Sequence, residues 1–307
     1  MNDLIIIGGG PAGLTAAIYA IRAGLNVLVA EKLSFGGQVV NAYEIENFPG
    51  FAEPIIGWEL MSAMENQVKR LGVESIFSEV LSIEKDEREE KNFSIKFADE
   101  SIKKTKTIIV CTGASHRKLG IPGEDNFVGR GVSYCATCDG AFFKDKIVSV
   151  IGGGDTALAE ALFLTKFASK VYLIHRRNEF RASDILQKRI KENNKIVVVL
   201  NTIPVSINGE NKVESIMLQN KNDNSERKLE TDGVFIFVGI NPNTNFMDKT
   251  LLNLAGELIT NEKMETSISG LYAAGDVRAK SKRQIITACA DGATAAINVY
   301  EYINKGA

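Results

Sequence analysis

Two cysteines separated by two residues, Cys135 and Cys138 in the segment GVSYCATCDG, can do chemistry of three kinds. They can supply half of a zinc site, form a structural disulfide, or exchange electrons as a reversible dithiol. A structural zinc ion needs four ligands, but Cys111 and Cys289 stand far apart in apolar or small-residue segments, and the chain has only 2 histidines. A disulfide that closes so short a loop restrains little chain entropy. The pattern therefore favours redox chemistry, for which the CxxC spacing lowers one thiol pKa and allows a reversible disulfide.

A dithiol of this kind also needs a proton donor, and Asp139 is the titratable side chain directly beside the pair. Histidine is the usual general acid, but His116 and His175 are distant along the chain. The alternative is that Asp139 only forms the Asp-Gly turn that follows. Phe142 and Phe143 are either core residues or an apolar docking surface for a partner protein, and the charged residues that follow them favour docking.

The N-terminus contains the elements that position a dinucleotide. The apolar strand LIII precedes GGGPAG, a helix follows, and the strand LNVLVA comes next. Gly8, Gly10 and Gly13 have the GxGxxG spacing, which allows a tight turn and lets a pyrophosphate approach the helix N-terminus. Glu31, directly after the second strand, is placed to accept hydrogen bonds from a ribose. These features together predict a Rossmann-like dinucleotide-binding unit.

The same pattern occurs a second time. The strand KIVSVI is followed by Gly152, Gly154 and Ala157 in GxGxxA spacing, then by a helix and the strand KVYLIH. Here His175–Arg177 take the place of the acid, and Arg181 follows four residues later. Arginine suits a 2′-phosphate, so the second site is expected to prefer NADP over NAD. The alternative is a solvated basic face at a strand end.

The order of these segments indicates how the domains are assembled. KTIIVCTGA and GVFIFVG would close the two units with similar strands, as in an internal repeat. The C-terminal segment LYAAGDV and its alanine-rich helix complete the first unit better than the second. We therefore predict an α/β fold with one dinucleotide-binding domain, residues 115–243, inserted into the other, residues 1–114 and 244–307. The charged stretch at residues 86–91, DEREEK, is expected to be a solvated hairpin turn.

Composition excludes several other classes. A chain of 307 residues with 45% hydrophobic content can bury two cores, and its formal net charge of -2 does not favour nucleic acid or an anionic membrane surface. No apolar run has the roughly 18 residues of a membrane span. The few cysteines and the absence of a recognisable secretion signal predict a cytoplasmic protein.

The motifs as a set resemble those of the low-molecular-weight thioredoxin reductases of bacteria, and the resemblance extends over essentially the whole chain. It rests on GGGPAG, GGQ, ENFPGF, CTGA, YCATCDG, GGGDTALAEA, HRRNEFRA, GINPNT and AAGDV, which occur in the family's order. The resemblance implies FAD at the first nucleotide site, NADPH at the second, and usually a homodimer. The FAD site would comprise Gly8, Gly10, Pro11, Ala12, Gly13, Glu31, Gly37, Gln38, Asn47, Gly113, Gly275, Asp276, Arg283, Gln284 and Ile285. The NADPH site would comprise Gly152, Gly154, Asp155, Thr156, His175, Arg176, Arg177 and Arg181.

The family's cycle transfers a hydride from NADPH to FAD, then two electrons to the cysteine pair, and finally reduces a disulfide of thioredoxin. By resemblance, Cys138 faces the flavin and Cys135 attacks thioredoxin. Because the dithiol and the NADPH site belong to one domain and the flavin to the other, they must take turns at the flavin unless they use opposite faces. The alternatives are a flavoprotein that reduces another small dithiol protein or a peroxidase component, a ferredoxin-linked thioredoxin reductase, and a ferredoxin–NADP reductase type without a dithiol.

Overall fold

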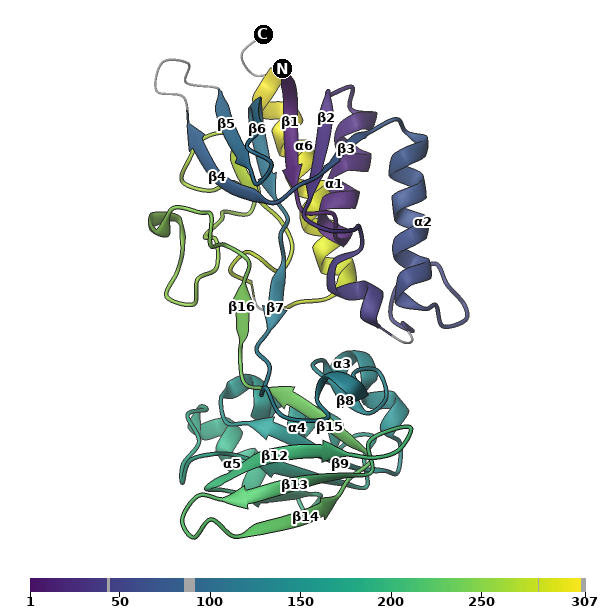
Figure 1. Cartoon of the computed structure of the whole chain (residues 1–307), viewed down its shortest axis with the longest axis vertical. Helices are drawn as coiled ribbons and strands as arrows, with labels where there is room; N and C mark the ends of the chain where they lie inside the picture. Colours follow the sequence, from purple (N-terminus) through teal and green to yellow (C-terminus); the bar gives the residue numbers. More distant parts are fainter. Residues whose placement is uncertain (43–44, 86–91, 281, 305–307) are drawn as a thin grey trace. The chain divides into compact units, whose positions relative to one another are not determined.

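The computed structural model describes residues 1–42, 45–85, 92–280 and 282–304. The stretch 86–91, which was expected to form a hairpin turn, lies outside these described residues. The chain divides into two compact units (Figure 1). Unit 1 consists of Met1–Ser115 with Asn241–Ala307, and unit 2 consists of His116–Ile240.

Among the described residues, unit 1 is built on a seven-stranded sheet with the order β3-β2-β1-β6-β5-β4, and β17 also pairs with β6. The strands are β1 (Asn2–Ile7), β2 (Val27–Glu31), β3 (Glu74–Phe77), β4 (Val80–Lys85), β5 (Phe93–Phe97), β6 (Ile102–Val110) and β17 (Leu271–Ala273). β1, β2, β3, β6 and β17 run parallel, whereas β5 is antiparallel to both of its neighbours, β4 and β6. The carboxyl ends of the parallel strands therefore meet at one edge of the sheet.

Both faces of this sheet are buried, because alternate residues of its parallel strands point to opposite sides. Leu4 and Val29 pack on one face against α1 (Pro11–Arg22), α2 (Gly57–Arg70) and α6 (Ile285–Asn304). Figure 1 shows these three helices gathered on one side of the sheet. Ile5 and Val110 pack on the other face, against β5 and residues 247–277. This double burial explains why the strands are continuous apolar runs in the sequence.

Unit 2 contains a parallel sheet with the order β11-β10-β9-β15-β8 among its described residues. Its strands are β8 (Val132–Ser133), β9 (Ile147–Gly152), β10 (Lys170–Ile174), β11 (Ile196–Val199) and β15 (Gly233–Phe237). One face is covered by α4 (Asp155–Leu164) and α5 (Asp184–Glu192). The other face packs against the antiparallel strands β12 (Thr202–Asn208), β13 (Ser215–Asn220) and β14 (Glu226–Glu230).

The two units repeat one arrangement. β1–α1–β2 corresponds to β9–α4–β10, and β6 pairs with β1 as β15 pairs with β9. The C-terminal strand β17 completes the sheet of unit 1, as the sequence predicted. The α/β fold class with two Rossmann-like units, one inserted into the other, is confirmed. The chain passes between the units through β7 (Ala114–His116) and β16 (Ile240–Pro242), which pair with each other.

One expectation from the sequence is wrong. Phe143 was expected to lie on a docking surface, but it is buried in the core of unit 2. Its ring packs edge-on against that of Phe235, with the two ring centroids 5.1 Å apart. Phe142 is partly buried against the same core. The charged residues after this pair gave a misleading signal, because the aromatic partner on β15 comes from a distant part of the chain.

Candidate active site

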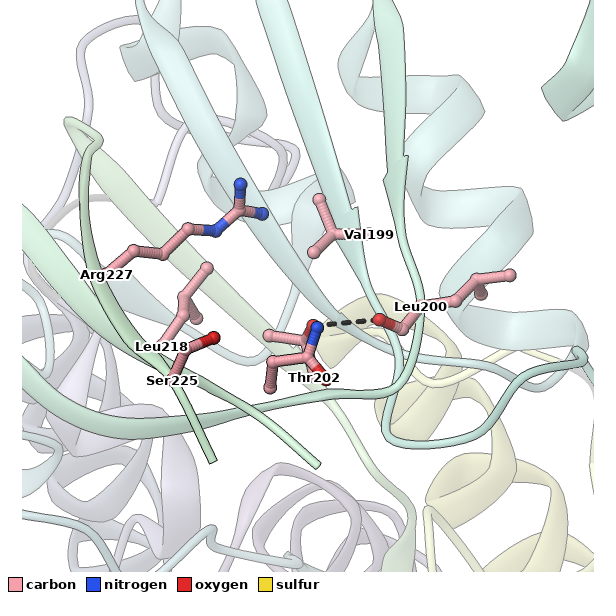
Figure 2. A pocket seen from close by; sticks show the side chains of 7 residues that line it. Val199, Leu200, Thr202, Leu218, Ser225 and Arg227 are labelled. Carbon is pink, nitrogen blue, oxygen red and sulfur yellow. Dashed lines mark hydrogen bonds between the residues drawn. The ribbon is translucent and has the colours of Figure 1, made fainter. Parts of the chain in front are cut away.

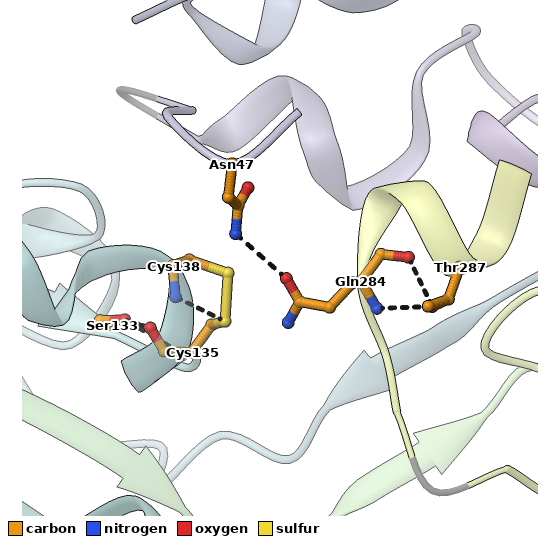
Figure 3. Close-up of a disulfide and its surroundings, with 6 residues drawn as sticks. All are labelled: Asn47, Ser133, Cys135, Cys138, Gln284 and Thr287. Carbon is orange, nitrogen blue, oxygen red and sulfur yellow. Dashed lines mark hydrogen bonds between the residues drawn. A yellow bond between two sulfur atoms is a disulfide. The ribbon is translucent and has the colours of Figure 1, made fainter. Parts of the chain in front are cut away.

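The cysteine pair lies at the start of a short helix in unit 2. Cys135 is the N-cap of α3 (Ala136–Asp139), directly after β8 and Tyr134. Cys135 and Cys138 form a disulfide with their Cα atoms 5.3 Å apart, and the Cys138 N–H donates to Cys135 Sγ at 3.2 Å. Cys135 is half-buried and Cys138 is exposed. Figure 3 shows the disulfide with Ser133, whose Oγ accepts a hydrogen bond from the Cys135 N–H at 3.0 Å.

Asp139 ends α3, directly beside the cysteine pair. Its backbone N–H donates to the Cys135 carbonyl oxygen at 3.2 Å. Burial raises the pKa of the Asp139 carboxyl above its usual value, and this effect outweighs a hydrogen bond from Ser133 that lowers it. A raised pKa is the direction of shift that a general acid requires. Ser133 was not predicted from the sequence, because serine before a CxxC motif carries no distinctive signal.

The first glycine turn follows β1 and leads into α1. Gly8 has φ +107°, and a Cβ there would lie 2.4 Å from the Cys111 carbonyl oxygen. A Cβ on Gly13 would lie 1.9 Å from the Gly8 carbonyl oxygen, so α1 approaches the turn as closely as it does only because glycine is present. A Cβ on Gly10 would meet nothing within 4 Å. The turn therefore combines close packing on one side with open space beside Gly10.

Several other residues predicted for the FAD site lie close to this turn. Glu31 Oε2 accepts a hydrogen bond from the Gly9 N–H at 2.7 Å. A Cβ on Gly37 would lie 3.5 Å from the Cα of Gly10, and a Cβ on Gly275 would lie 2.9 Å from the Cβ of Ala12. These contacts bring the ends of β1, β2 and β17 together, as expected where parallel strands share an edge.

Of the remaining predicted FAD residues, Asn47, Arg283 and Gln284 make side-chain contacts within unit 1. Asn47 Nδ2 donates to Gln284 Oε1 at 3.2 Å, and the Gln284 N–H donates to Thr287 Oγ1 at 3.1 Å (Figure 3). Arg283 forms an ion pair with Glu257. Gln38 lies in the 3₁₀ helix η1 (Gly37–Asn41) and is exposed, and Gly113 follows the end of β6 with φ +66°.

A buried charge cluster beside Gly275 was missed by sequence reasoning. Asp291 of α6 is 8% exposed, and its carboxylate accepts hydrogen bonds from the Gly275 N–H, from Arg278 Nε and Nη2, and from Lys280 Nζ at 2.9–3.1 Å. Burial alone would raise the pKa of Asp291, but the bonds and charges of Arg278 and Lys280 outweigh it and lower that pKa. An isolated acid in the alanine-rich C-terminal helix was the only signal available in the sequence.

These residues fit a bound FAD. The N-cap Gly10 makes no side-chain hydrogen bond to α1, so the first N–H groups of the helix face the open space beside that glycine. Asp276 Oδ1 is buried without a hydrogen-bond partner among the described residues, and Lys280 Nζ lies 3.4 Å from it. Burial raises the pKa of Asp276. A ribityl hydroxyl donating to Asp276 would supply the missing bond.

The second glycine turn has the same features and fits NADPH. The N-cap Gly154 makes no side-chain hydrogen bond to α4, and a Cβ on Gly154 would meet nothing within 4 Å. Asp155 Oδ1 accepts from the Ser183 N–H at 2.9 Å, and the Arg181 N–H donates to the Gly153 carbonyl oxygen at 2.8 Å. Thr156 is exposed in the first turn of α4.

The three residues after β10 are not equivalent. His175 is 5% exposed, and its ring lies so close to Gly153 that a Cβ there would be 2.2 Å away. Its Nε2 has no hydrogen-bond partner among the described residues, and burial and the neighbouring arginines lower its pKa. Arg176 and Arg177 are exposed. The geometry therefore separates a neutral imidazole beneath the turn from two guanidinium groups available to a phosphate.

An open cavity of about 280 Å³ in unit 2 is formed by residues other than those of the glycine turn (Figure 2). The Thr202 N–H in its wall donates to the His175 carbonyl oxygen at 3.0 Å. The wall consists of Val199, Leu200, Thr202, Leu218, Asn220, Ser225 and Arg227. None of the residues predicted to bind a cofactor lines this cavity. Within the described part of the chain, no helix is long and apolar enough to span a membrane.

Comparison with known proteins identifies the family. Residues 2–292 match the family described as pyridine nucleotide-disulphide oxidoreductase. A thioredoxin reductase of Bacillus subtilis is 43% identical, with 99% of this chain and 95% of the relative covered. One of Treponema pallidum is 44% identical, with 98% and 97% covered. The crystal structure of thioredoxin reductase from Streptococcus pyogenes has a TM-score of 0.95 at 42% identity, with 99% of both chains covered.

The chain therefore belongs to the pyridine nucleotide-disulphide oxidoreductase family. Within that family, its resemblance to the thioredoxin reductases is confirmed over almost the whole chain. The oxidoreductase class and the cofactors FAD and NADPH, which were expected from the motifs, are confirmed with it.

Proposed function

We propose that this protein is a thioredoxin reductase in which the Cys135–Cys138 pair carries two electrons from NADPH to the disulfide of thioredoxin. The observation that carries the proposal is the CxxC disulfide at the start of α3 with Asp139, whose pKa is raised, directly beside it. The relatives at 43–44% identity support the same activity.

FAD would be held in unit 1. The glycine turn and the uncapped N-terminus of α1 would bind its pyrophosphate, Glu31 a ribose, and Asp276 a ribityl hydroxyl. A bound FAD would supply the two-electron chemistry that links hydride transfer from NADPH to reduction of the cysteine disulfide. The division of the chain into two compact units supports the assignment of residues 1–114 and 244–307 to an FAD-binding domain and of residues 115–243 to an NADPH-binding domain.

NADPH would be held in unit 2 by the second glycine turn. The N–H groups at the start of α4 suit its pyrophosphate, and the exposed guanidinium groups of Arg176 and Arg177, with Arg181 nearby, suit its 2′-phosphate. The unpartnered Nε2 of His175 offers a further polar contact.

The reduced pair would act by thiol–disulfide exchange. The Cys135 thiolate attacks one sulfur of the thioredoxin disulfide, which gives a mixed disulfide and releases the other thioredoxin sulfur as a thiolate. Cys138 then attacks Cys135, so that the enzyme disulfide forms again and thioredoxin leaves as a dithiol. Asp139 donates a proton to a departing sulfur. Cys138 is the more exposed of the two cysteines in the disulfide form.

Two further assignments belong to the proposal. A cytoplasmic location is supported by Cys111 and Cys289, which are free and buried. A homodimer is supported by exposed apolar side chains on two helices of unit 1 that pack on each other, Tyr19 on α1 and Ile297 and Tyr300 on α6.

Single cysteine variants test the function and the order of attack together. Cys138→Ser leaves Cys135 free and should trap thioredoxin as a mixed disulfide that is visible by mass spectrometry, whereas Cys135→Ser should not. Both variants should lose thioredoxin reduction. Both should keep NADPH-dependent reduction of an artificial acceptor that takes electrons directly from the flavin. Trapping by Cys135→Ser alone would reverse the two roles. If wild-type protein with FAD and NADPH does not reduce thioredoxin, the proposed function is wrong.

A further inference from the structure

A buried carboxylate in unit 2 has no role in the activity described above. Glu124 is 2% exposed and accepts three hydrogen bonds. Its Oε1 receives the Leu119 N–H at 3.0 Å and the Tyr134 hydroxyl at 2.7 Å, and its Oε2 receives the Gly120 N–H at 2.7 Å. Burying a polar group is costly unless it is hydrogen-bonded, so these bonds link Tyr134 to residues 119–120 through Glu124.

Tyr134 is held on its ring as well as at its hydroxyl. The ring stacks on His116 at a centroid distance of 4.9 Å and an interplanar angle of 15°. It also packs against the buried core that contains Val132 and Ile207. Burial and the hydrogen bond to Glu124 raise the pKa of the Tyr134 hydroxyl, which therefore remains protonated and able to donate.

Tyr134 is also the residue that connects the sheet to the redox pair. Ser133 before it is paired with Phe235 of β15, and Cys135 after it is the N-cap of α3. The Ser133 Oγ accepts from the Cys135 N–H (Figure 3). The backbone that leads into Cys135 is thus fixed by β8, by Ser133 and by the side chain of Tyr134.

We propose that Tyr134 and Glu124 are positioning residues for the dithiol: their hydrogen bond holds Cys135 close to Cys138 in the reduced protein and so favours closure of the disulfide. The inference rests on the proposed function only because it takes Cys135 and Cys138 as the redox centre. A thiol held near its partner has a higher effective concentration than a mobile one. Loosening Tyr134 therefore makes the disulfide easier to reduce.

The test measures the thiol–disulfide equilibrium of Tyr134→Phe in the FAD-loaded full chain. Two glutathione molecules supply two electrons and two protons to the Cys135–Cys138 disulfide and leave as glutathione disulfide. After equilibration, free thiols are alkylated and the peptide that contains both cysteines is quantified by mass spectrometry. We expect Tyr134→Phe to shift the equilibrium three- to tenfold toward the dithiol, which corresponds to about 15 to 30 mV.

Tyr172→Phe is the matched control, because it also removes only a hydroxyl. Tyr172 lies in the same unit as Tyr134 and packs against the same core, which contains Val132 and Ile207. It should leave the equilibrium unchanged. Glu124→Gln should shift the equilibrium in the same direction as Tyr134→Phe, and the double variant should shift it less than the sum of the two. Thermal unfolding establishes that each variant is folded.

Two results would overturn the proposal. One is a Tyr134→Phe equilibrium equal to that of the wild type. The other is an equal shift in Tyr172→Phe, which would indicate general loosening of the unit. Neither measurement uses thioredoxin. A failure of the proposed function would instead be seen as wild-type protein that does not reduce thioredoxin, so the two failures can be told apart.

Discussion

Glu31 Oε2 accepts a hydrogen bond from the Gly9 N–H at 2.7 Å, and Glu31 Oε1 accepts one from the Leu33 N–H at 3.1 Å. The acid that the sequence predicts to bind a ribose thus also holds the glycine turn. An ionised carboxylate has about four acceptor sites, so both oxygens can still accept from ribose hydroxyls. The side chain is therefore oriented in advance for the nucleotide that the turn would bind.

The glycine turn allows fold and cofactor binding to be separated. Gly10→Ala places a methyl group where nothing lies within 4 Å, so the variant should fold normally and lose FAD affinity by tenfold or more, which is about 1.4 kcal/mol. Gly13→Ala places a methyl 1.9 Å from the Gly8 carbonyl oxygen and should fail to fold. FAD titration of apoprotein and circular dichroism measure the two effects. Normal FAD affinity in Gly10→Ala would contradict the assignment of this space to the pyrophosphate.

Arg176 and Arg177 should determine which pyridine nucleotide is preferred. Replacing both with alanine removes two exposed guanidinium groups, and charge-assisted hydrogen bonds are worth about 1.5–3 kcal/mol. We expect KM for NADPH to rise about ten- to a hundredfold while KM for NADH changes little. Arg189→Ala, an exposed arginine on α5, is the control. Equal loss with both nucleotides would show that these arginines do not contact a 2′-phosphate.

Asp139 should limit turnover as a proton donor. Asp139→Asn cannot donate a proton, so we expect thioredoxin reduction to fall about a hundredfold, within the usual range for a general acid. NADPH-dependent reduction of an artificial acceptor should persist. The rate of thioredoxin reduction by the wild type should fall as the pH rises through the raised pKa of Asp139. The variant should not show this decrease. Asp145→Asn is the control, because Asp145 is exposed and asparagine tolerates its φ of +59°. If Asp139→Asn turns over at the wild-type rate, Asp139 is not the proton donor and only forms the turn.

The same substitution should increase stability at neutral pH. Because the pKa of Asp139 is raised on folding, the native state binds its proton more tightly than the unfolded state does. Stability is then lost as the pH rises from the ordinary value of 3.8 through the folded pKa. Asp139→Asn cannot ionise, so its denaturation midpoint should exceed that of the wild type at pH 7 and match it below pH 3.8. A lower midpoint at pH 7 would mean that burial does not control this carboxyl.

Asp291 should stabilise unit 1 and its predicted flavin site. Asp291→Ala leaves Arg278 and Lys280 without their buried partner, and breaking a buried pair in this way costs about 3–5 kcal/mol. Because the pKa of Asp291 is lowered, its contribution is present above pH 3.8 and is lost as the pH falls through the folded pKa. Denaturation curves at several pH values and FAD titration measure both effects. Glu53→Ala, at an exposed site in unit 1, should change stability by less than about 0.5 kcal/mol.

The fold could be predicted from the sequence where the signal is local. Strand, glycine turn and helix follow one another within a short segment, so the spacing of Gly8, Gly10 and Gly13 predicts both the turn and its place in the fold. The insertion of one unit into the other was also predictable, because the C-terminal segment LYAAGDV indicates a further strand and the second unit already has its own strands. The placement of Phe143 was not predictable, because its partner Phe235 lies in a strand far along the chain.

By itself the sequence determined the two dinucleotide-binding turns, the CxxC pair and the class of chemistry that they support. Only the tertiary structure decided the environment of each polar side chain. It placed His175 beneath its turn and left Arg176 exposed, gathered Arg278 and Lys280 around Asp291, and joined Glu124 to Tyr134 beside Cys135. Burial and hydrogen-bond partners depend on which segments pack together, and that information is not contained in the spacing of residues within one motif.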